Sequence, residues 1–218
     1  MAMLESITYV ISRSLYVSLT NRCNAVSLLE SRGPGFVLPP TFSRLPSGFE
    51  PSAEQVASEV ARVLADGAQP TEVVFAGAGE PLLKLRALEG AAGLIREQSA
   101  IPMRLNTNGL VPKSEVVDTV RQLKDAGLSG VTVALATADP QQYIELMKPE
   151  PIRLSPVFSI PLGHAEVCSF VSVCAAAGLK VECTAVAAPG VQIEATEALA
   201  HNLGANSFRS RTFHPAMA

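Results

Sequence analysis

The sequence predicts an α/β protein in which six strand–helix units form a partial (βα)6 barrel of the TIM type. Short β-rich runs alternate with longer helical patterns along the 218 residues, an order typical of parallel βα units. Hydrophobic residues make up 48% of the chain and charged residues 17%, which fits strands that are buried on both faces. Because six units cannot close the usual eight-stranded barrel, we expect an open barrel. We expect residues 1–218 to form a single domain of this kind.

The predicted helices have recognisable ends. Pro51 and Ser52 open the first helix and Gly67 closes it, and Gly127 and Gly178 end two later helices in the same way. Strands are expected at residues 15–20, 73–77, 103–107, 131–136, 179–186 and 207–213. Helices are expected at residues 52–66, 84–98, 114–127, 139–147, 164–177 and 192–203.

Two stretches rich in proline interrupt this alternation. Residues 31–50 are predicted to form a long loop after the first strand, and residues 148–163, which contain four prolines, are predicted to form an extended connector. Loops of the first kind are usually functional or mobile. We therefore expect that a protein partner, if the chain has one, docks on the 31–50 loop or on the edge strand near 207–213.

Charge and hydropathy exclude several classes of partner. The formal net charge of -3 and the scattered Lys and Arg residues give no basic stripe, so no nucleic-acid partner is expected. No apolar run approaches the roughly 20 residues of a membrane-spanning helix, and Glu5 interrupts the N-terminal segment, which does not read as a secretory signal. We expect a soluble, intracellular protein without a membrane partner.

The cysteines do not form a recognisable metal or disulfide pattern. Cys23, Cys168, Cys174 and Cys183 show no short paired spacing, so neither a zinc site nor a disulfide framework is predicted. We expect the last three to be small buried hydrophobic residues. Cys23 has three readings, a relic thiol, a reactive nucleophile or a residual metal ligand. The first is favoured because only Arg22 is a local positive group.

Small and polar residues follow the predicted strands. In a parallel barrel the loops after the strands gather at one rim, and that rim carries the active site. Gly77 and Gly79 would let a ligand approach the backbone closely, and Glu80 would present a carboxylate to a cation. The candidate rim residues are Asn21–Asn24, Gly77–Pro81, Asn106–Gly109, Thr137–Asp139, Ala187–Gly190 and His214–Pro215.

Three of these segments resemble motifs of radical S-adenosylmethionine (SAM) enzymes. FAGAGEPLL (75–83) resembles their Gly-x-Gly-Glu-Pro motif, LNTNG (105–109) resembles their third-strand signature, and SLTNRCN (18–24) resembles the entry to their cluster loop. The stretches VALATADPQQYIELMKP, GLKVECTAVAAPGV and FRSRTFHP are similar to a subgroup associated with TatD-type deoxyribonucleases. The motifs occur in order, one per strand end, over nearly the whole chain.

The resemblance implies a fold, two cofactors and a set of binding residues. The family has a partial (βα)6 barrel whose first loop binds a four-iron, four-sulfur cluster through cysteines spaced Cys-x3-Cys-x2-Cys, and the cluster cleaves SAM to a 5′-deoxyadenosyl radical. By this resemblance the methionyl amine of SAM would be bound at Gly77, Ala78, Gly79 and Glu80. The region of Asn106 and Asn108 would line the ribose and carboxylate side.

The chain departs from the family at the cluster loop. Counting from Cys23, the second and third cysteine positions are occupied by Ser27 and Glu30. A hydroxyl and a carboxylate are poor ligands for an iron–sulfur cluster, so the motif is degenerate and we expect the cluster, and with it the radical chemistry, to be absent. The preferred interpretation is a pseudoenzyme that retains a SAM-like ligand site or serves as a scaffold. Two alternatives remain, an active radical SAM enzyme with an unusual cluster shell and a pure protein-interaction subunit.

Several polar residues keep a structural interpretation beside the functional one. Glu80 could start a helix rather than bind a ligand, and Asn106 and Asn108 could be turn residues. Arg209 and Arg211 share one face of the last predicted strand, where they could meet an anion or protect an exposed edge. His164, His201 and His214 are expected to be structural, surface or capping residues.

Overall fold

The computed structural model describes residues 7–153, 155 and 157–216. The chain divides into two compact units. The first unit contains residues up to Cys23, Leu38–Thr107 and Gln122–Gly130. The second contains Asn24–Val37, Asn108–Arg121 and the residues from Val131 onward.

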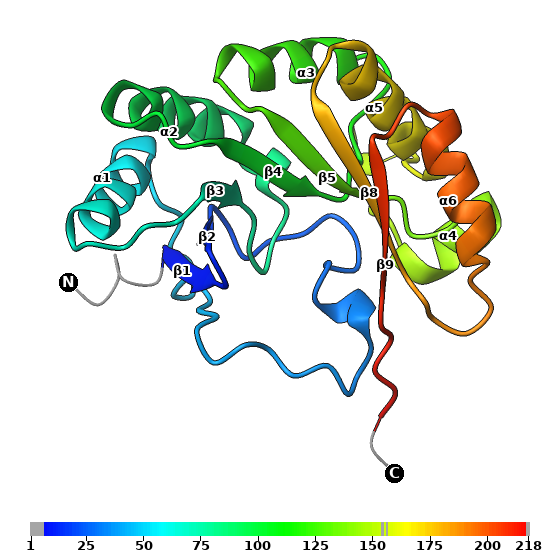
Figure 1. Cartoon of the computed structure of the whole chain (residues 1–218). Helices are drawn as coiled ribbons and strands as arrows, with labels where there is room; N and C mark the ends of the chain where they lie inside the picture. The colour runs from blue at the N-terminus through cyan, green and yellow to red at the C-terminus, as the bar shows by residue number, and fades with distance from the viewer. Residues whose placement is uncertain (1–6, 154, 156, 217–218) are drawn as a thin grey trace. The chain divides into compact units, whose positions relative to one another are not determined.

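The first unit has a four-stranded arrangement backed by helices. Strand β1 runs antiparallel to β2, and β2, β3 and β4 are parallel neighbours. Helices α1 and α2 pack against each other on one side of these strands (Figure 1). Its elements are β1 (Thr8–Ile11), β2 (Ser14–Val17), α1 (Ala53–Ala65), β3 (Glu72–Phe75), the short 3-10 helix η2 (Pro81–Lys84), α2 (Leu85–Gln98) and β4 (Met103–Thr107).

The second unit continues the alternation with the strand order β5, β8, β9. Strands β8 and β9 are parallel, with Cys183 opposite Phe208. Helix α3 (Val116–Asp125) and strand β5 (Gly130–Ala134) contain residues of both units. The remaining elements are the 3-10 helix η1 (Glu30–Arg32), α4 (Pro140–Met147), β6 (Ile152–Arg153), β7 (Ser159–Ile160), α5 (His164–Ala176), β8 (Lys180–Val186), α6 (Ile193–Asn202) and β9 (Ser207–Arg211).

Local sequence explains the helix boundaries. In α1 the Ser52 hydroxyl accepts a hydrogen bond from the Gln55 backbone N–H, and the Gln55 side chain accepts from the Ser52 N–H, which is a capping box. Val56, Ala57 and Val60 form the buried stripe of this helix. In β4, Met103, Leu105 and Thr107 are buried and the alternate positions are half-buried, so the helices cover one face and polar residues occupy the other.

The predicted alternation of strands and helices is confirmed, with additions. All six expected strands and all six expected helices are present, with shifted ends, as β2, β3, β4, β5, β8 and β9 and α1 to α6. The strand β1 is an addition, because the sequence analysis predicted nothing before residue 15. The connector at 148–163 is not simply extended, because β6 and β7 pair antiparallel within it. Residues 33–50 contain no helix or strand, as expected of a long loop.

Candidate functional site

The turn after β3 lies against the segment that follows β2. A Cβ atom on Gly77, whose φ is 154°, would lie 2.6 Å from the Ser18 hydroxyl oxygen, and one on Gly79 would lie 2.6 Å from the Thr20 carbonyl oxygen. The Glu80 backbone N–H donates to the Arg22 carbonyl oxygen at 2.8 Å. Both glycines therefore allow a close approach, and the group they approach is the chain's own backbone and side chain.

The Glu80 carboxylate is buried within the first unit. Its side chain is 3% exposed, and its Oε1 atom accepts hydrogen bonds from the Leu82 N–H at 3.0 Å and from the Thr107 hydroxyl at 2.7 Å. The first bond caps η2, where Pro81 occupies the first position. The second joins the turn after β3 to the end of β4. The sequence placed Thr107 in the rim segment Asn106–Gly109 but gave no sign of this bond, because a partner 27 residues away leaves no local pattern.

Ser18 is the one side chain at this turn with an unmet hydrogen-bonding requirement. The residue is 1% exposed, and its hydroxyl oxygen has no hydrogen-bond partner in the part of the chain that the structure describes. It lies directly beside Gly77. Ala78, between the two glycines, is itself buried. A buried hydroxyl without a partner is costly, and sequence analysis gave Ser18 no role.

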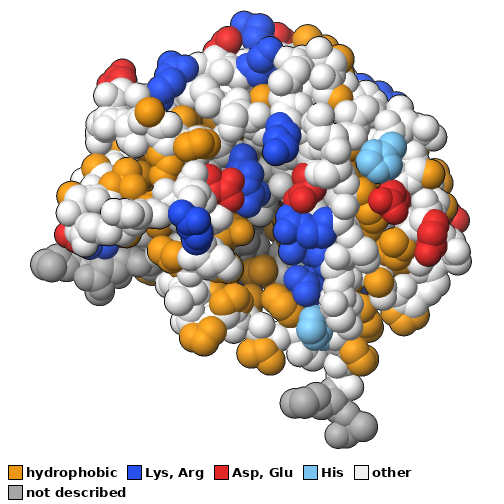
Figure 2. Space-filling view, in the orientation of Figure 1, with side chains coloured by type: hydrophobic (Ala, Val, Ile, Leu, Met, Phe, Trp, Pro, Cys, Tyr) orange, Lys and Arg blue, Asp and Glu red, His pale blue; other side chains and the backbone are white. Residues whose placement is uncertain are grey.

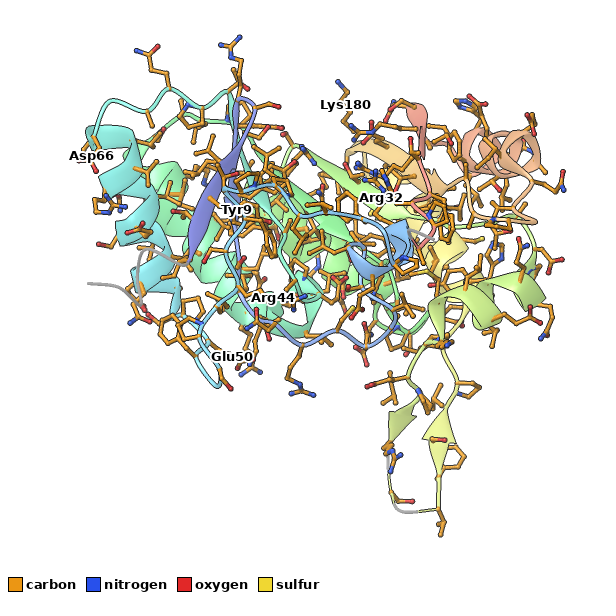
Figure 3. The ribbon with its side chains drawn as sticks, turned by 90° about the horizontal axis from the view of Figure 1, so that it is seen from below. Tyr9, Arg32, Arg44, Glu50, Asp66 and Lys180 are labelled. Carbon is orange, nitrogen blue, oxygen red and sulfur yellow. The ribbon has the colours of Figure 1, made fainter. Side chains whose placement is uncertain are left out.

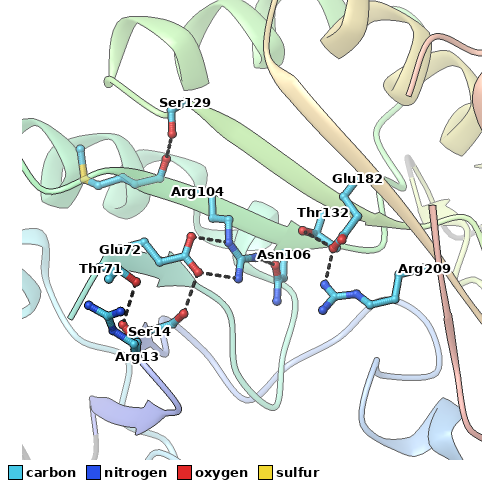
Figure 4. Close-up of polar contacts among 11 residues, drawn as sticks. Arg13, Ser14, Thr71, Glu72, Arg104, Asn106, Ser129, Thr132, Glu182 and Arg209 are labelled. Carbon is cyan, nitrogen blue, oxygen red and sulfur yellow. Dashed lines mark hydrogen bonds and ion pairs between the residues drawn. The ribbon is translucent and has the colours of Figure 1, made fainter. Parts of the chain in front are cut away.

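Asn106 belongs to a charged network on the open face of β2, β3 and β4 (Figure 4). Arg104 donates to the Asn106 side-chain oxygen and makes a two-pronged ion pair with Glu72, at 2.8 and 3.0 Å. The Ser14 hydroxyl donates to Glu72 at 2.7 Å. Asn106 thus faces a half-buried polar surface rather than serving only as a turn residue.

In the second unit Asn108 anchors the start of the first loop. Its side-chain nitrogen donates to the Asn24 side-chain oxygen at 2.8 Å, and its own oxygen accepts from the Leu110 N–H at 3.0 Å. Asn108 is 1% exposed. The Asn24 carbonyl oxygen in turn accepts from the Glu150 N–H at 2.8 Å. Asn108 therefore organises the segment around Asn24 and the residues after α4.

Ser27 and Glu30, at the two missing cysteine positions, bind each other. The Ser27 hydroxyl and backbone N–H donate to Glu30 Oε2 at 2.8 and 3.0 Å, and the Glu30 N–H donates back to the Ser27 hydroxyl at 3.2 Å. This Ser-x-x-Glu arrangement has the reciprocal hydrogen bonds of a capping box and closes the turn just before η1, whose own N-cap is Leu29. The Ser-x-x-Glu spacing is visible in the sequence, where it was interpreted only as two cysteine positions occupied by poor metal ligands.

The residues present do not fit an iron–sulfur cluster. Such clusters are held by thiolates, whereas the Ser27 and Glu30 oxygens hold each other and Cys23 is the only thiol of the motif. Among the described residues no group of three His, Cys, Asp or Glu side chains could hold a metal ion. Cys174 and Cys183 are fully buried, and burial raises the pKa of both thiols to about 12. Cys168 is only half-buried, which corrects the expectation that it is a buried hydrophobic residue.

The Arg209 side chain of β9 forms an ion pair within the second unit. Arg209 pairs with Glu182 of β8, which also accepts from the Thr132 hydroxyl at 3.3 Å (Figure 4). Figure 2 shows Lys and Arg side chains gathered beside β9 with acidic side chains among them. His201 lies 3.8 Å from Glu197 on the same helix. The positive charge of Arg209 is therefore balanced by the carboxylate of Glu182 on the neighbouring strand.

The loop after β2 is joined to the C-terminal segment. The His214 N–H donates to the Arg32 carbonyl oxygen at 2.8 Å, and the Gly35 N–H donates to the His214 carbonyl oxygen at 3.0 Å. The Arg32 guanidinium lies 4.5 Å from the centre of the Phe36 ring, and that ring lies 5.4 Å from the His214 ring. Desolvation lowers the pKa of Arg32. His214 is thus part of a packed cluster rather than a simple surface residue.

Comparison with known proteins identifies the fold. No curated protein sequence matches the chain, but the model of the radical SAM superfamily matches residues 39–203. SuiB from Streptococcus suis, bound to S-adenosylmethionine, superposes with a TM-score of 0.62 at 16% identity over 93% of this chain and 39% of its own. A radical SAM methyltransferase from Sphaerobacter thermophilus superposes with a TM-score of 0.61 at 16% identity over 91% of this chain and 55% of its own.

These comparisons agree with the order of strands and helices. The chain spans 39% and 55% of the lengths of these two structures. No helix in the described residues has the length and apolar character needed to cross a membrane. The mostly parallel strands, the covering helices and the superpositions correspond to a partial TIM-type barrel. The family match covers more than half of the 218 residues, and the chain belongs to the radical SAM superfamily.

Proposed function

We propose that this protein is a cluster-free member of the radical SAM superfamily that binds SAM, or a ligand with the same methionyl group, without cleaving it to a radical. The observation that carries this proposal is the reciprocal bonding of Ser27 and Glu30. It occupies the two oxygens that would otherwise be offered to iron, and it uses them to close the turn just before η1. The similarity of 75–83 and 18–24 to family motifs supports descent from an enzyme that had a cluster.

Cluster loss removes the reductive chemistry and also weakens SAM binding. In the family the fourth iron holds the amino and carboxylate groups of SAM, so a cluster-free member must bind the ligand through its own polar atoms. The backbone of Gly77–Gly79 and the hydroxyl of Ser18 are the candidates in the first unit. Ser18 supports the proposal because its buried hydroxyl lacks a partner, and an added donor or acceptor at this turn would satisfy it.

Asn106 and Arg104 extend this candidate site. Both lie on the open face of β4 and are half-buried. Arg104, whose charge is paired with Glu72, donates to the Asn106 side-chain oxygen and so holds that amide in place. SuiB, which has a related fold, was solved with S-adenosylmethionine bound, and TsrM from Kitasatospora setae with the analogue aza-SAM. We assign Glu80 a supporting role, because its carboxylate caps η2 and binds Thr107.

Titration calorimetry of SAM into the iron-free protein tests the binding. We expect saturable binding of SAM. Ser18→Ala should weaken it, because that change removes the hydroxyl proposed to bind the ligand. The alanine leaves no buried polar group without a partner, so the fold should be kept. Ser47→Ala, in an exposed part of the loop, is the matched control and should bind as the native chain does. Absence of saturation up to millimolar SAM would refute the binding part of the proposal.

Anaerobic reconstitution with iron and sulfide tests the loss of chemistry. We expect fewer than about one iron per chain and no 5′-deoxyadenosine in the presence of a reductant. A stable cluster with turnover of SAM would favour instead the active enzyme with an unusual cluster shell.

An interaction subunit is the second candidate, and one observation favours it. The β6–β7 hairpin projects from α4 (Figure 3), and it exposes Val157 (96%), Phe158 (59%) and Ile160 (39%) to solvent. Apolar residues gathered at an exposed tip often mark a protein-binding site.

Replacing Val157 and Phe158 by serine should abolish association with such a partner and leave the melting temperature unchanged, as measured by sedimentation and calorimetry. The similarity of 133–149 and 178–191 to the TatD-associated subgroup is the basis for choosing candidate partners.

A further inference from the structure

A cysteine and a histidine at the start of α5 lie within hydrogen-bonding reach of each other. His164 is the first residue of α5 and Cys168 follows four positions later, so both side chains lie on the same face of the helix. The Cys168 sulfur lies 3.6 Å from His164 Nδ1 and 3.8 Å from Nε2. The sequence contains this spacing, which we had read as two unrelated structural residues.

The His164 ring is oriented by a third group. Its Nε2 atom lies 2.9 Å from the Thr137 carbonyl oxygen, in the segment after β5. Because a carbonyl oxygen can only accept, Nε2 must carry the proton of this hydrogen bond. The Nδ1 atom of the neutral ring then keeps its lone pair. The Cys168 sulfur, nearly equidistant from the two ring nitrogens, lies over the ring face, so Nδ1 accepts its proton after the Cys168 side chain turns toward the ring edge. The His164 side chain is held firmly, because the residue is 8% exposed and the centre of its ring lies 5.6 Å from the centre of the Tyr143 ring.

A thiol, a base within reach of it and a group that orients the base are the parts of an activated nucleophile. We propose that Cys168 and His164 form a thiol–imidazole pair that makes Cys168 a site of covalent exchange with small disulfides. This proposal concerns the second unit and is independent of SAM binding.

The surroundings of Cys168 explain why a base is needed. Burial raises the pKa of the thiol; the nearby positive charge of Lys113 lowers it, and the negative charge of Glu166 raises it further. Cys168 therefore stays protonated at neutral pH, and a thiolate forms only if a neighbour accepts the proton during attack. Cys168 is a half-buried residue, and a small disulfide is the reactant for which access is least demanding.

The exchange step balances without another reactant. The Cys168 sulfur attacks one sulfur of the disulfide while its proton moves to His164 Nδ1, and a new S–S bond forms as the old one breaks. The departing sulfur leaves as a thiolate and takes the proton from His164. Cys168 is oxidised to a mixed disulfide, and the other half of the small disulfide is reduced to a thiol.

Site-resolved labelling with dithiodipyridine, a small neutral disulfide, tests the pair in the full chain. The rate of modification at each cysteine is measured by peptide mass spectrometry from about pH 5 to pH 9. The variants are His164→Gln, whose amide can still donate to the Thr137 carbonyl, and His201→Gln as a matched control on an exposed helix face. Cys23, which is also half-buried, is the internal comparator, and a melting curve checks the fold of each variant.

We expect the Cys168 rate in the native chain to rise by less than about tenfold per pH unit and to level off within the measured range, because the thiol transfers its proton to His164 and not to solvent. His164→Gln should lower the Cys168 rate at neutral pH by about tenfold or more and turn its profile into a steady rise toward high pH. His201→Gln should change neither. A purely structural histidine would not alter the shape of the pH profile.

Two results would overturn the proposal. One is a native Cys168 that stays unmodified while Cys23 reacts. The other is a Cys168 rate that climbs about tenfold per pH unit up to about pH 9, as for a simple thiol of raised pKa. The pH profile of the native chain is sufficient to establish this second result, so the test remains valid even if His164→Gln fails to fold.

Discussion

At the scale of single residues, Glu80 joins two segments of the first unit through one buried oxygen. Replacing it by alanine would leave the Leu82 N–H and the Thr107 hydroxyl without their acceptor. We expect Glu80→Ala to lower the free energy of unfolding by about 2–4 kcal/mol, and Glu80→Gln, which keeps an acceptor oxygen, by about 1 kcal/mol. Urea unfolding measures both.

Glu97, exposed at the end of α2, provides the matched control for this measurement. Glu97→Ala should change stability by less than about 0.5 kcal/mol. Equal effects of Glu80→Ala and Glu97→Ala would contradict the structural role, and would return Glu80 to the ligand role that the motif alone implies.

The buried thiols of Cys174 and Cys183 predict how stability depends on pH. Burial, together with the charge of neighbouring thiols, raises the pKa of both to about 12, whereas in the unfolded chain a thiol ionises near about pH 8.5. Above that pH the unfolded state holds fewer protons than the folded state, so stability falls as pH rises. Each thiol can contribute a slope of up to about 1.4 kcal/mol per pH unit.

A variant without these two thiols isolates the effect from other groups that titrate in the same range. Unfolding free energies between about pH 8.5 and pH 10.5 should fall less steeply for the double variant Cys174→Ala, Cys183→Ala than for the native chain. The smaller alanine side chains will lower the unfolding free energy at every pH. This does not affect the test, because it compares the slopes of unfolding free energy against pH. Identical slopes would mean that these thiols ionise normally in the folded protein.

Residue patterns revealed part of the candidate site, and non-local partners supplied the rest. The order of motifs correctly indicated the family, and the loss of two cysteines was visible directly. The sequence could not show that Glu80 binds Thr107 or that Asn108 binds Asn24, because these pairs join segments 27 and 84 residues apart. The Ser27–Glu30 capping box was local and readable, but the comparison with metal ligands concealed it.

At the scale of elements, the loop after β2 depends on close packing against the C-terminal segment. A Cβ atom on Gly35 would overlap the Pro215 carbonyl group, and it would lie 3.4 Å from the His214 carbonyl oxygen. Because these are backbone atoms, one of the two segments would have to move. We expect Gly35→Ala to destabilise the protein by about 1–3 kcal/mol and to speed hydrogen exchange at the His214 N–H.

Gly93 in α2 offers a matched comparison, because a Cβ atom added there meets nothing within 4 Å. Gly93→Ala should be neutral or should stabilise the protein by about 0.5–1 kcal/mol, since alanine favours a helix. If Gly35→Ala behaved in the same way and His214 exchange were unchanged, the loop would not depend on the C-terminal segment.

Element prediction succeeded where periodicity was strong and failed where it was short. The capping box at Ser52 and the closing glycines gave helices close to those observed. The four-residue β1 is too short to show a period, and its antiparallel pairing with β2 rests on a tight connection at residues 12–13. The β6–β7 hairpin was hidden by prolines, which usually break strands.

At the scale of the whole molecule, a family fold that has lost only its metal ligands should accept them again. The double variant Ser27→Cys, Glu30→Cys restores the Cys-x3-Cys-x2-Cys spacing that begins at Cys23, and it removes the hydrogen bonds that hold Ser27 and Glu30 together. After anaerobic reconstitution we expect this variant to bind iron and sulfide, with the broad visible absorption of a thiolate-bound cluster, while the native chain does not. The single variants Ser27→Cys and Glu30→Cys are controls, because each still lacks one thiolate and should bind substantially less iron. A double variant that binds no more iron than the native chain would mean that residues other than the three ligands also prevent cluster binding. In that case the loop of residues 31–50, through its contacts with the C-terminal segment, would hold this part of the fold in place of a cluster.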